Sequence, residues 1–248
     1  MPRQARRKSK TGIYHVIMRG INRQSIFEDD EDYERFIETL KKYKETSEYK
    51  IYAFCLMRNH FHLLMKTEKE DLDLVIKRIA GSYVYWYNLK YHRSGHLFQD
   101  RYKSEAVEDD PYFLTVLRYI HHNPIKAGLY RLVSDYKYSS YGEYITGDSR
   151  LVDINYVLNI VDKDSFVKFN NESKTDSCMD IADEVCRIND TDGATIMQRV
   201  SNCANSAEFL RLDIPQRNLC IKKLKQEGLS IRQISRLTGV SVGISRKL

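Results

Sequence analysis

The hydrophobic pattern of the first 145 residues alternates between runs of strand length and longer runs with a helical period. Strands are predicted at Tyr14–Arg19, Ile51–Met57 and His60–Lys66, and within Leu97–Val107. Helices are predicted at Asp29–Tyr49, Leu72–His92 and Pro111–His122, two of them with acidic residues at the start. The order β-α-β-β-α-β, then α, predicts an α+β fold: a ferredoxin-like (split βαβ) antiparallel sheet with helices on one face.

The pattern changes near residue 150. Residues 151–215 read as a helical linker region, with the clearest helices at Asp162–Asn170 and Asp180–Ile188. Residues 216–248 suggest a helix-turn-helix that binds DNA, with helices at Gln216–Glu227, Ile231–Leu237 and from Val242, and a turn at Thr238-Gly239-Val240. An ordinary helical hairpin with a basic face is the alternative. Residues 1–150 are therefore expected to form one domain, and 216–248 a DNA-binding segment.

Composition narrows the class of protein. The 248 residues carry a net charge of +6, and no run reaches the eighteen or so apolar residues of a membrane span. The basic N-terminus leads into the first strand without a hydrophobic segment typical of a secretory signal. The five cysteines include no C-x-x-C pair, so reduced thiols are expected rather than a zinc site. We expect a cytoplasmic protein with no membrane association.

Tyrosine and histidine are concentrated in the first domain. Seventeen of the 18 tyrosines lie in residues 1–150, and all seven histidines lie at or before His122. Two of those histidines frame Phe61 in the sequence His60-Phe61-His62, inside a predicted strand. Since alternate side chains of a strand point to the same face, His60 and His62 should lie side by side, as half of a metal site. A pair of surface histidines flanking a core Phe is the alternative.

A second constellation lies at the end of the third predicted helix, in Tyr119-Ile120-His121-His122-Asn123-Pro124. Tyr119 and Asn123 are four residues apart, which places them on one face of a helix. Pro124 disfavours helical geometry at Asn123 and predicts the end of the helix there.

These two motifs, in this order, resemble the single-tyrosine HUH transposases, and more closely the REP-associated tyrosine transposases. The flanks resemble that family too: Tyr14-His15-Val16 with Arg19-Gly20 and Asn22-Arg23-Gln24, and Gly95-His96-Leu97-Phe98-Gln99-Asp100-Arg101-Tyr102. The resemblance covers roughly residues 11–145 and implies a bacterial protein that is associated with the nucleoid when bound to DNA.

The resemblance implies a metal-dependent endonuclease and strand transferase that nicks single-stranded DNA near a hairpin and can rejoin it without ATP. His60, His62 and Asn123 would hold one Mg²⁺ or Mn²⁺, which suits imidazole and amide-oxygen ligands. Tyr119 would be the nucleophile and would form a 5′-phosphotyrosine. A free phenol has a pKa near ~10, so it would need activation.

Other roles are assigned on weaker grounds. His121 could assist proton transfer, although a histidine on the helix surface is an equal interpretation. The residues expected to contact DNA are Arg19, Asn22, Arg23, Arg101, Lys103, Arg232 and Arg236. His15 is interpreted as a strand residue rather than a ligand. Because relatives act as dimers or as monomers, a homodimer is one open possibility.

Two other functions stay open. The first is a non-catalytic, domesticated regulator that binds hairpin DNA or RNA. The second is a replication initiator or relaxase with the same chemistry, which is disfavoured because the chain has no ATPase phosphate loop and Ile120–Gly128 holds no second Tyr.

Overall fold

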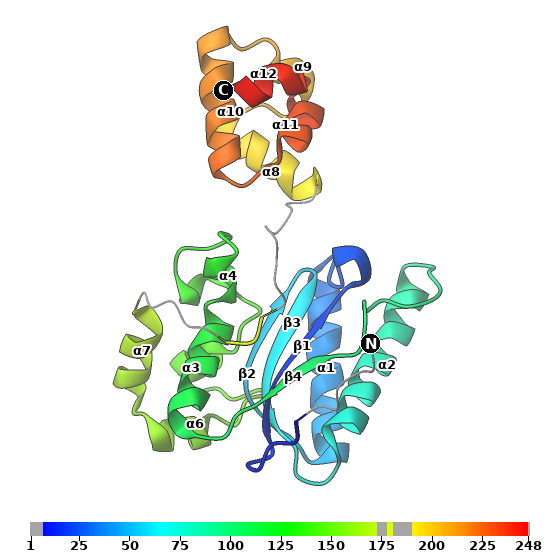
Figure 1. Cartoon of the computed structure of the whole chain (residues 1–248), viewed down its shortest axis with the longest axis vertical. Coiled ribbons are helices and arrows are strands. Elements are labelled where there is room, and N and C mark those ends of the chain that lie inside the picture. The colour runs from blue at the N-terminus through cyan, green and yellow to red at the C-terminus, as the bar shows by residue number, and fades with distance from the viewer. Residues whose placement is uncertain (1–6, 173–177, 181–189, 248) are drawn as a thin grey trace. The chain divides into compact units, whose positions relative to one another are not determined.

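The computed structural model describes residues 7–172, 178–180 and 190–247, and the chain forms two compact units, Met1–Ile181 and Ala182–Leu248 (Figure 1). The division lies later in the chain than the change of composition near residue 150 indicates. The reason is that the helices after residue 140 pack onto the first unit: α5 (Tyr141–Thr146), α6 (Ile154–Ile160) and α7 (Lys163–Asn171). Val157 and Phe166 are fully buried in the core of that unit.

The first unit contains a four-stranded antiparallel sheet in the order β2-β3-β1-β4. The strands are β1 (Ile13–Arg19), β2 (Lys50–Met57), β3 (His60–Lys66) and β4 (Lys103–Ala106). Helices α1 (Asp30–Ser47) and α2 (Leu72–Lys90) are the two crossovers of the split βαβ arrangement. They pack against each other on one face of the sheet, where Phe36 of α1 contacts Phe61 with ring centroids 4.7 Å apart. The fold class expected from the sequence is thus observed.

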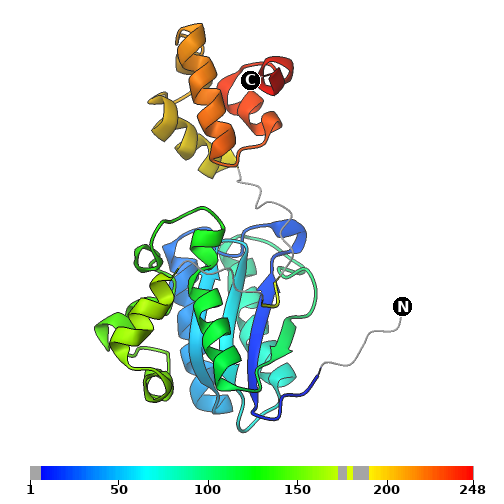
Figure 2. The same ribbon diagram turned by 60° about the vertical axis from the view of Figure 1, so that its left-hand side comes forward.

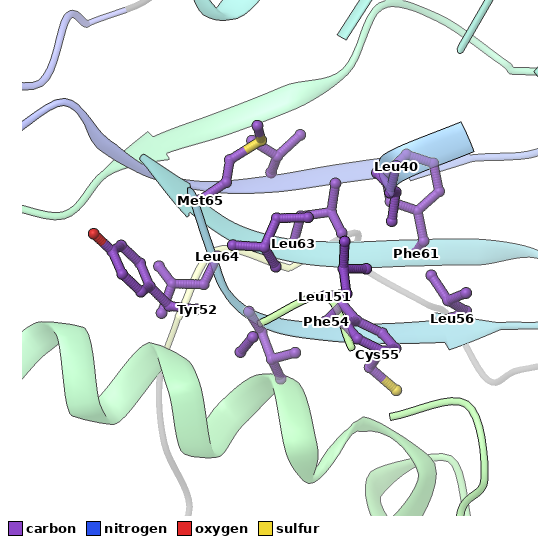
Figure 3. Packing of buried hydrophobic residues seen from close by; sticks show 14 of the residues in the cluster. Leu40, Tyr52, Phe54, Cys55, Leu56, Phe61, Leu63, Leu64, Met65 and Leu151 are labelled. Atoms are coloured by element: carbon purple, nitrogen blue, oxygen red, sulfur yellow. The ribbon is translucent and has the colours of Figure 1, made fainter. Parts of the chain in front are cut away.

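The opposite face of the sheet is covered by α3 (Asp110–His121), which contacts β2 and β3 and lies in front of the sheet in Figure 2. Side chains of β2 and β3 alternate between the two faces. Figure 3 shows Phe61 directed towards Leu40 of α1, whereas Cys55 points to the other side. His62 pairs with Cys55 and Ile17 across the sheet, so these three residues share the face that α3 covers.

Local sequence explains where α3 begins and ends. The Asp109 carboxylate accepts a hydrogen bond from Tyr112 N at 2.8 Å, and Pro111 occupies the first turn. The helix ends at His121, one residue before the predicted end, but the prediction that helical geometry stops at Asn123 is wrong. A second short helix, α4 (Asn123–Lys126), follows at once because Pro124 suits a first turn. Two 3-10 turns complete the unit, η1 (Ile21–Arg23) and η2 (Val133–Asp135).

The second unit is all-helical, as predicted for the C-terminal region. Its helices are α8 (Asp190–Ser201), α9 (Ser206–Phe209), α10 (Ile214–Gln226), α11 (Ile231–Thr238) and α12 (Val242–Lys247). A separate core includes Phe209, Ile221, Leu224 and Ile234. Apart from Asp180, the helix predicted at Asp180–Ile188 lies outside the described residues.

The cysteines for which the structure gives a state, Cys55, Cys178, Cys203 and Cys220, are free thiols, as expected. Within the part of the chain that the structure describes, no helix combines the length and the apolar character needed to cross a membrane.

Candidate active site at the end of the sheet

His60 and His62 project from β3 towards α3, and their ring centroids lie 5.1 Å apart. His60 is 6% exposed and lies opposite Arg19 at the end of the strand pair. Its Nδ1 lies 2.6 Å from the Asn59 amide oxygen. Because that oxygen can only accept, Nδ1 donates the hydrogen of this contact, and Nε2 is the nitrogen through which His60 could bind a ligand.

His62 is fully buried, and burial lowers its pKa well below the usual value. His60, His15 and Lys126 lower this pKa further through charge repulsion. The imidazole of His62 is therefore neutral at pH 7, the state in which it binds a metal. Its Nε2 is buried and has no hydrogen-bond partner among the described residues. A buried nitrogen without a partner is costly unless a ligand completes it, so the pair fits a divalent cation.

Further ligands for a cation at this pair would have to come from other chemical groups. The described residues contain no group of three or more His, Cys, Asp or Glu that could hold a metal ion. A cation here would take its other ligands from an amide, water or substrate oxygen. The Asn123 amide nitrogen donates to the Tyr119 carbonyl at 3.0 Å and to the Ile120 carbonyl at 3.4 Å. The amide oxygen is thus the atom of Asn123 that could serve a metal.

Tyr119 lies against the same histidines. Its ring centroid is 5.9 Å from that of His62 and 5.8 Å from that of His15, both with edge geometry. Tyr119 belongs to the same chain as the histidines and is 1% exposed. The predicted nucleophile therefore lies beside His62, which in turn lies beside His60, within one chain.

Lys126 completes this arrangement, and the sequence interpretation did not identify it. Its Nζ lies 3.6 Å from the centre of the Tyr119 ring, while the residue as a whole is exposed. A cation at this position attracts the ring electrons and favours negative charge on the phenol oxygen. Lys126 follows Tyr119 by seven residues, a spacing that places two residues on the same face of a continuous helix. This spacing could have identified Lys126 only if α4 were known to continue the direction of α3.

His121 is not part of this group, and its predicted role in proton transfer is not supported. Its Nδ1 lies 3.1 Å from the Asn170 amide oxygen and its Nε2 lies 2.8 Å from Ser140 Oγ. Burial lowers the pKa of His121 to about 3. Because residues two apart on a helix differ by about 200° in direction, His121 faces α7 and not the Tyr119 side.

His15, interpreted from the sequence as a strand residue, lies in β1 and contacts His62. Its Nε2 lies 3.0 Å from His62 Nδ1, and the two rings stack with centroids 5.3 Å apart. Both residues are fully buried. The contact depends on the register of β1 against β3, in which Ile17 faces His62 and His15 faces Leu64.

The residues predicted to hold DNA in the first loop lie beside His60. Arg19 donates to the Gln99 side-chain oxygen through Nε at 3.2 Å and Nη2 at 3.1 Å. The loop turns at Gly20, whose backbone N–H donates to the Asn59 carbonyl at 2.8 Å. A Cβ at Gly20 would lie 2.3 Å from the Gln24 carbonyl oxygen, so no other residue fits this turn.

Asn22 and Arg23 follow in η1, both with positive φ, and Asn22 is exposed. Arg101 and Lys103 are exposed on the other side of β1. Lys103 faces Ile17, which also faces His62, so Lys103 shares the histidine face of the sheet. Arg101 contributes to an open pocket of about 420 Å³ that is lined by Ile21, Val84, His96, Leu97, Phe98, Gln99, Asp100 and Arg101.

Arg232 and Arg236 lie one turn apart on α11 in the second unit, and both are exposed. Their helix begins with a capping box between Ser230 and Gln233 and ends at Gly239, which has a φ of 73°. Val240 is buried after this glycine, and α12 follows.

Part of the chain is similar to known proteins. Residues 8–123 match the family described as "Transposase IS200 like". A protein of Haemophilus influenzae, named as a REP-associated tyrosine transposase, is 30% identical over 114 residues, which are 40% of this chain. The match spans 64% of the length of that relative.

Solved structures include a REP-associated tyrosine transposase bound to a REP hairpin, with a TM-score of 0.53 and 21% identity. The alignment covers 59% of this chain and 86% of that protein, and shows a shared fold. A protein of Deinococcus radiodurans named as a transposase aligns with a TM-score of 0.35 and 18% identity, over 49% of this chain and 97% of the other. Residues 8–123 are therefore similar to the IS200-like transposase family, and part of the chain is similar to a REP-associated tyrosine transposase.

Proposed function

We propose that this protein is a metal-dependent transposase that cleaves single-stranded DNA beside a hairpin through a 5′-phosphotyrosine, and can rejoin it. The observation that carries the proposal is the packing of Tyr119 against His62, whose buried Nε2 has no protein partner among the described residues. The similarity of residues 8–123 to a transposase family supports the same reaction.

In the proposed reaction, Tyr119 Oη attacks the scissile phosphorus. A phosphorus–Oη bond forms, the bond from phosphorus to the 3′ oxygen breaks, and the leaving oxygen takes up a proton to give a free 3′-hydroxyl. The proton lost by the phenol passes to solvent, and the Lys126 ammonium stabilises charge on the phenol oxygen. One phosphodiester is exchanged for another, so the reverse attack rejoins the strand without ATP.

His60 and His62, with the Asn123 amide oxygen, are the residues that would hold Mg²⁺ or Mn²⁺. A bound cation would supply Lewis-acid stabilisation of charge on the phosphate oxygens. Burial favours the neutral form of His62, and Asn59 fixes a hydrogen of His60 on Nδ1. The absence of an acidic cluster in the described residues leaves room for anionic phosphate oxygens as ligands.

The DNA backbone would reach the site over the basic positions around His60. Arg19 and Lys103 lie on the histidine face, and Asn22, Arg23 and Arg101 lie at the same end of β1. The similar structure named for its bound REP hairpin supports a hairpin as the ligand.

The direct test is incubation of the protein with Mn²⁺ and labelled single-stranded hairpin DNA from the genome that encodes it. A protein joined covalently to the new 5′ end of the cut strand, stable to denaturation, is the expected product.

One prediction concerns Lys126. Substitution of Lys126 by Met should slow adduct formation on the order of 100-fold, because an electrostatic partner of the phenol oxygen is lost. The residue is exposed, so the thermal unfolding temperature should change little. Rates are measured under single-turnover conditions. Lys137→Met is the matched control, since Lys137 lies over the Tyr138 ring at 4.8 Å, outside the site. Equal rates for both variants would contradict the role of Lys126.

For the second unit we propose a helix-turn-helix that binds duplex DNA, with α12 as its recognition helix. Two observations support this assignment: the exposed pair Arg232 and Arg236, and a buried Val240 in the turn between α11 and α12. From Arg217 onward, eight Lys and Arg residues accompany the single acidic residue Glu227. Such an excess suits contact with phosphates.

The double variant Arg232→Ala and Arg236→Ala should weaken binding to duplex DNA and leave adduct formation on a short single-stranded hairpin unchanged. Each lost phosphate contact lowers the dependence of log Kd on log salt by about 0.9, so the slope should fall by roughly two. Fluorescence anisotropy at several salt concentrations measures this slope. Lys41→Ala with Lys42→Ala, on α1, removes the same charge from the other unit and should leave the slope unchanged.

A second candidate function is a non-catalytic regulator that binds hairpin nucleic acid. The burial of Tyr119, at 1% exposure, favours this alternative, because a phosphate has to reach its hydroxyl group for cleavage. Sequence-selective hairpin binding without an adduct under Mg²⁺ or Mn²⁺ would identify the protein as such a regulator.

A further inference from the structure

His15 and His62 form a buried pair that is joined by a hydrogen bond between one ring nitrogen of each residue. His15 Nε2 and His62 Nδ1 are 3.0 Å apart, and the rings are inclined by 24°. The other two nitrogens, His15 Nδ1 and His62 Nε2, have no hydrogen-bond partner among the described residues. Both rings are fully buried, and burial disfavours the charged form of an imidazole. Both rings are therefore neutral, and each carries a single N–H.

Two neutral rings joined by one hydrogen bond have two possible arrangements. Either His62 Nδ1–H donates to His15 Nε2, or His15 Nε2–H donates to His62 Nδ1. In the first arrangement His62 Nε2 has a free lone pair. In the second it carries a hydrogen and cannot bind a cation. The geometry of the pair therefore links the ligand capacity of His62 to the hydrogen position on His15.

We propose that His15 is a positioning residue that accepts a hydrogen bond from His62 Nδ1, and so holds His62 in the tautomer that binds the metal ion. The inference rests on the proposed function, because it concerns the same metal site. For His60, the corresponding acceptor is the Asn59 amide oxygen, which fixes the His60 hydrogen on Nδ1. Each metal-binding histidine would then have one acceptor for its second nitrogen.

The energetics argue against a purely structural role for His15. A buried imidazole that leaves its Nδ1 without a partner loses hydrogen bonds that it makes in water. The neighbours of His15 on β1, Ile13 and Ile17, are buried apolar residues, and an aliphatic side chain at residue 15 would avoid this loss. A polar ring at this position is explained if its other nitrogen is needed to orient His62.

The test measures metal affinity directly, by titration calorimetry of the full chain with Mn²⁺ and without DNA. His15→Phe keeps an aromatic ring and removes the acceptor, so Kd for Mn²⁺ should rise about 10- to 100-fold. His15→Gln places an amide oxygen near the position of Nε2 and should stay closer to the wild type than to His15→Phe. His121→Phe is the matched control, because it removes another fully buried histidine from the same unit. That variant should lose thermal stability but keep its metal affinity.

A second measurement does not depend on the folding of any variant. In wild-type protein with ¹⁵N-labelled histidine and saturating Mg²⁺, long-range ¹H–¹⁵N spectra should show the His62 hydrogen on Nδ1. A hydrogen on His62 Nε2 under Mg²⁺ would overturn the inference. The inference would also be overturned if His15→Phe bound Mn²⁺ with wild-type affinity while His60→Ala and His62→Ala bound it weakly. That result would leave the proposed function intact. Wild-type affinity in His60→Ala and His62→Ala would overturn both.

Discussion

Substitution of Tyr119 by Phe is expected to abolish the covalent protein–DNA adduct, with a fall in rate of more than about a thousandfold. The change removes a single oxygen atom and keeps the ring that packs against His62 and His15. Folding and metal binding should therefore be close to wild type. Hairpin binding should also be retained, since the proposed phosphate contacts come from other residues. The readout is a denaturing gel of protein with labelled DNA, and Kd for the uncleaved hairpin is measured in parallel.

Tyr112→Phe provides the control on the same helix. Tyr112 lies two turns earlier on α3 and is partly buried; burial and a hydrogen bond with Glu105 raise its pKa. Loss of its hydroxyl should leave the adduct unchanged. An adduct that persists in Tyr119→Phe would assign the nucleophile to another of the 18 tyrosines. Loss of the adduct in both variants would indicate damage to α3 rather than loss of a nucleophile.

The local parts of the site could be predicted from the sequence. The spacing of His60 and His62 on a strand determines that both face the same side, and their rings are observed 5.1 Å apart. The order of strands and helices was also sufficient for the split βαβ sheet, because short connections allow few topologies. Both inferences depend on residues that are close together in the chain. At that range, the periodicity of the strand or helix determines the direction in which each side chain points.

Contacts between distant segments could not be predicted in the same way. The pairing of His15 with His62 needs the register of β1 against β3, 47 residues apart in sequence. Lys126 reaches Tyr119 only because α4 follows α3 after a single residue, which Pro124 had been taken to prevent. His121 shows that a residue close to Tyr119 in sequence need not lie in the site. It is two residues from Tyr119, yet the turn of the helix directs it to Asn170 and Ser140.

The boundary between the two units shows a limit of composition. Tyrosine content falls sharply after residue 150, but α6 and α7 still complete the first core through aliphatic and Phe side chains. Phe166 packs against Tyr144 with ring centroids 4.5 Å apart, and Arg118 lies over the Phe169 ring at 4.0 Å. Composition records which residue types a segment contains, whereas the boundary depends on which apolar surface each helix buries.

Substitution of His60 by Ala is the second change with a large expected effect. His60 is near the end of β3 and 6% exposed, so its loss should cost less stability than loss of the fully buried His62. Without it, one of two neutral nitrogen ligands is removed from a site that has no acidic cluster among the described residues. A metal contributes several kcal/mol to charge stabilisation, so adduct formation should fall on the order of a thousandfold. Mn²⁺ titration and single-turnover cleavage measure both effects. His92→Ala, at an exposed position after α2, should change neither.

Mixing the two inactive variants then tests the arrangement of the site. Tyr119 contacts His62 of its own chain, so each subunit contains the nucleophile and both histidines. A mixture of Tyr119→Phe and His60→Ala should form no adduct, because neither chain has a complete set. Recovery of up to about half of the wild-type adduct would instead require a dimer that exchanges α3, with the tyrosine of one subunit acting in the site of the other. Such exchange would also mean that the Tyr119–His62 contact belongs to an inactive state.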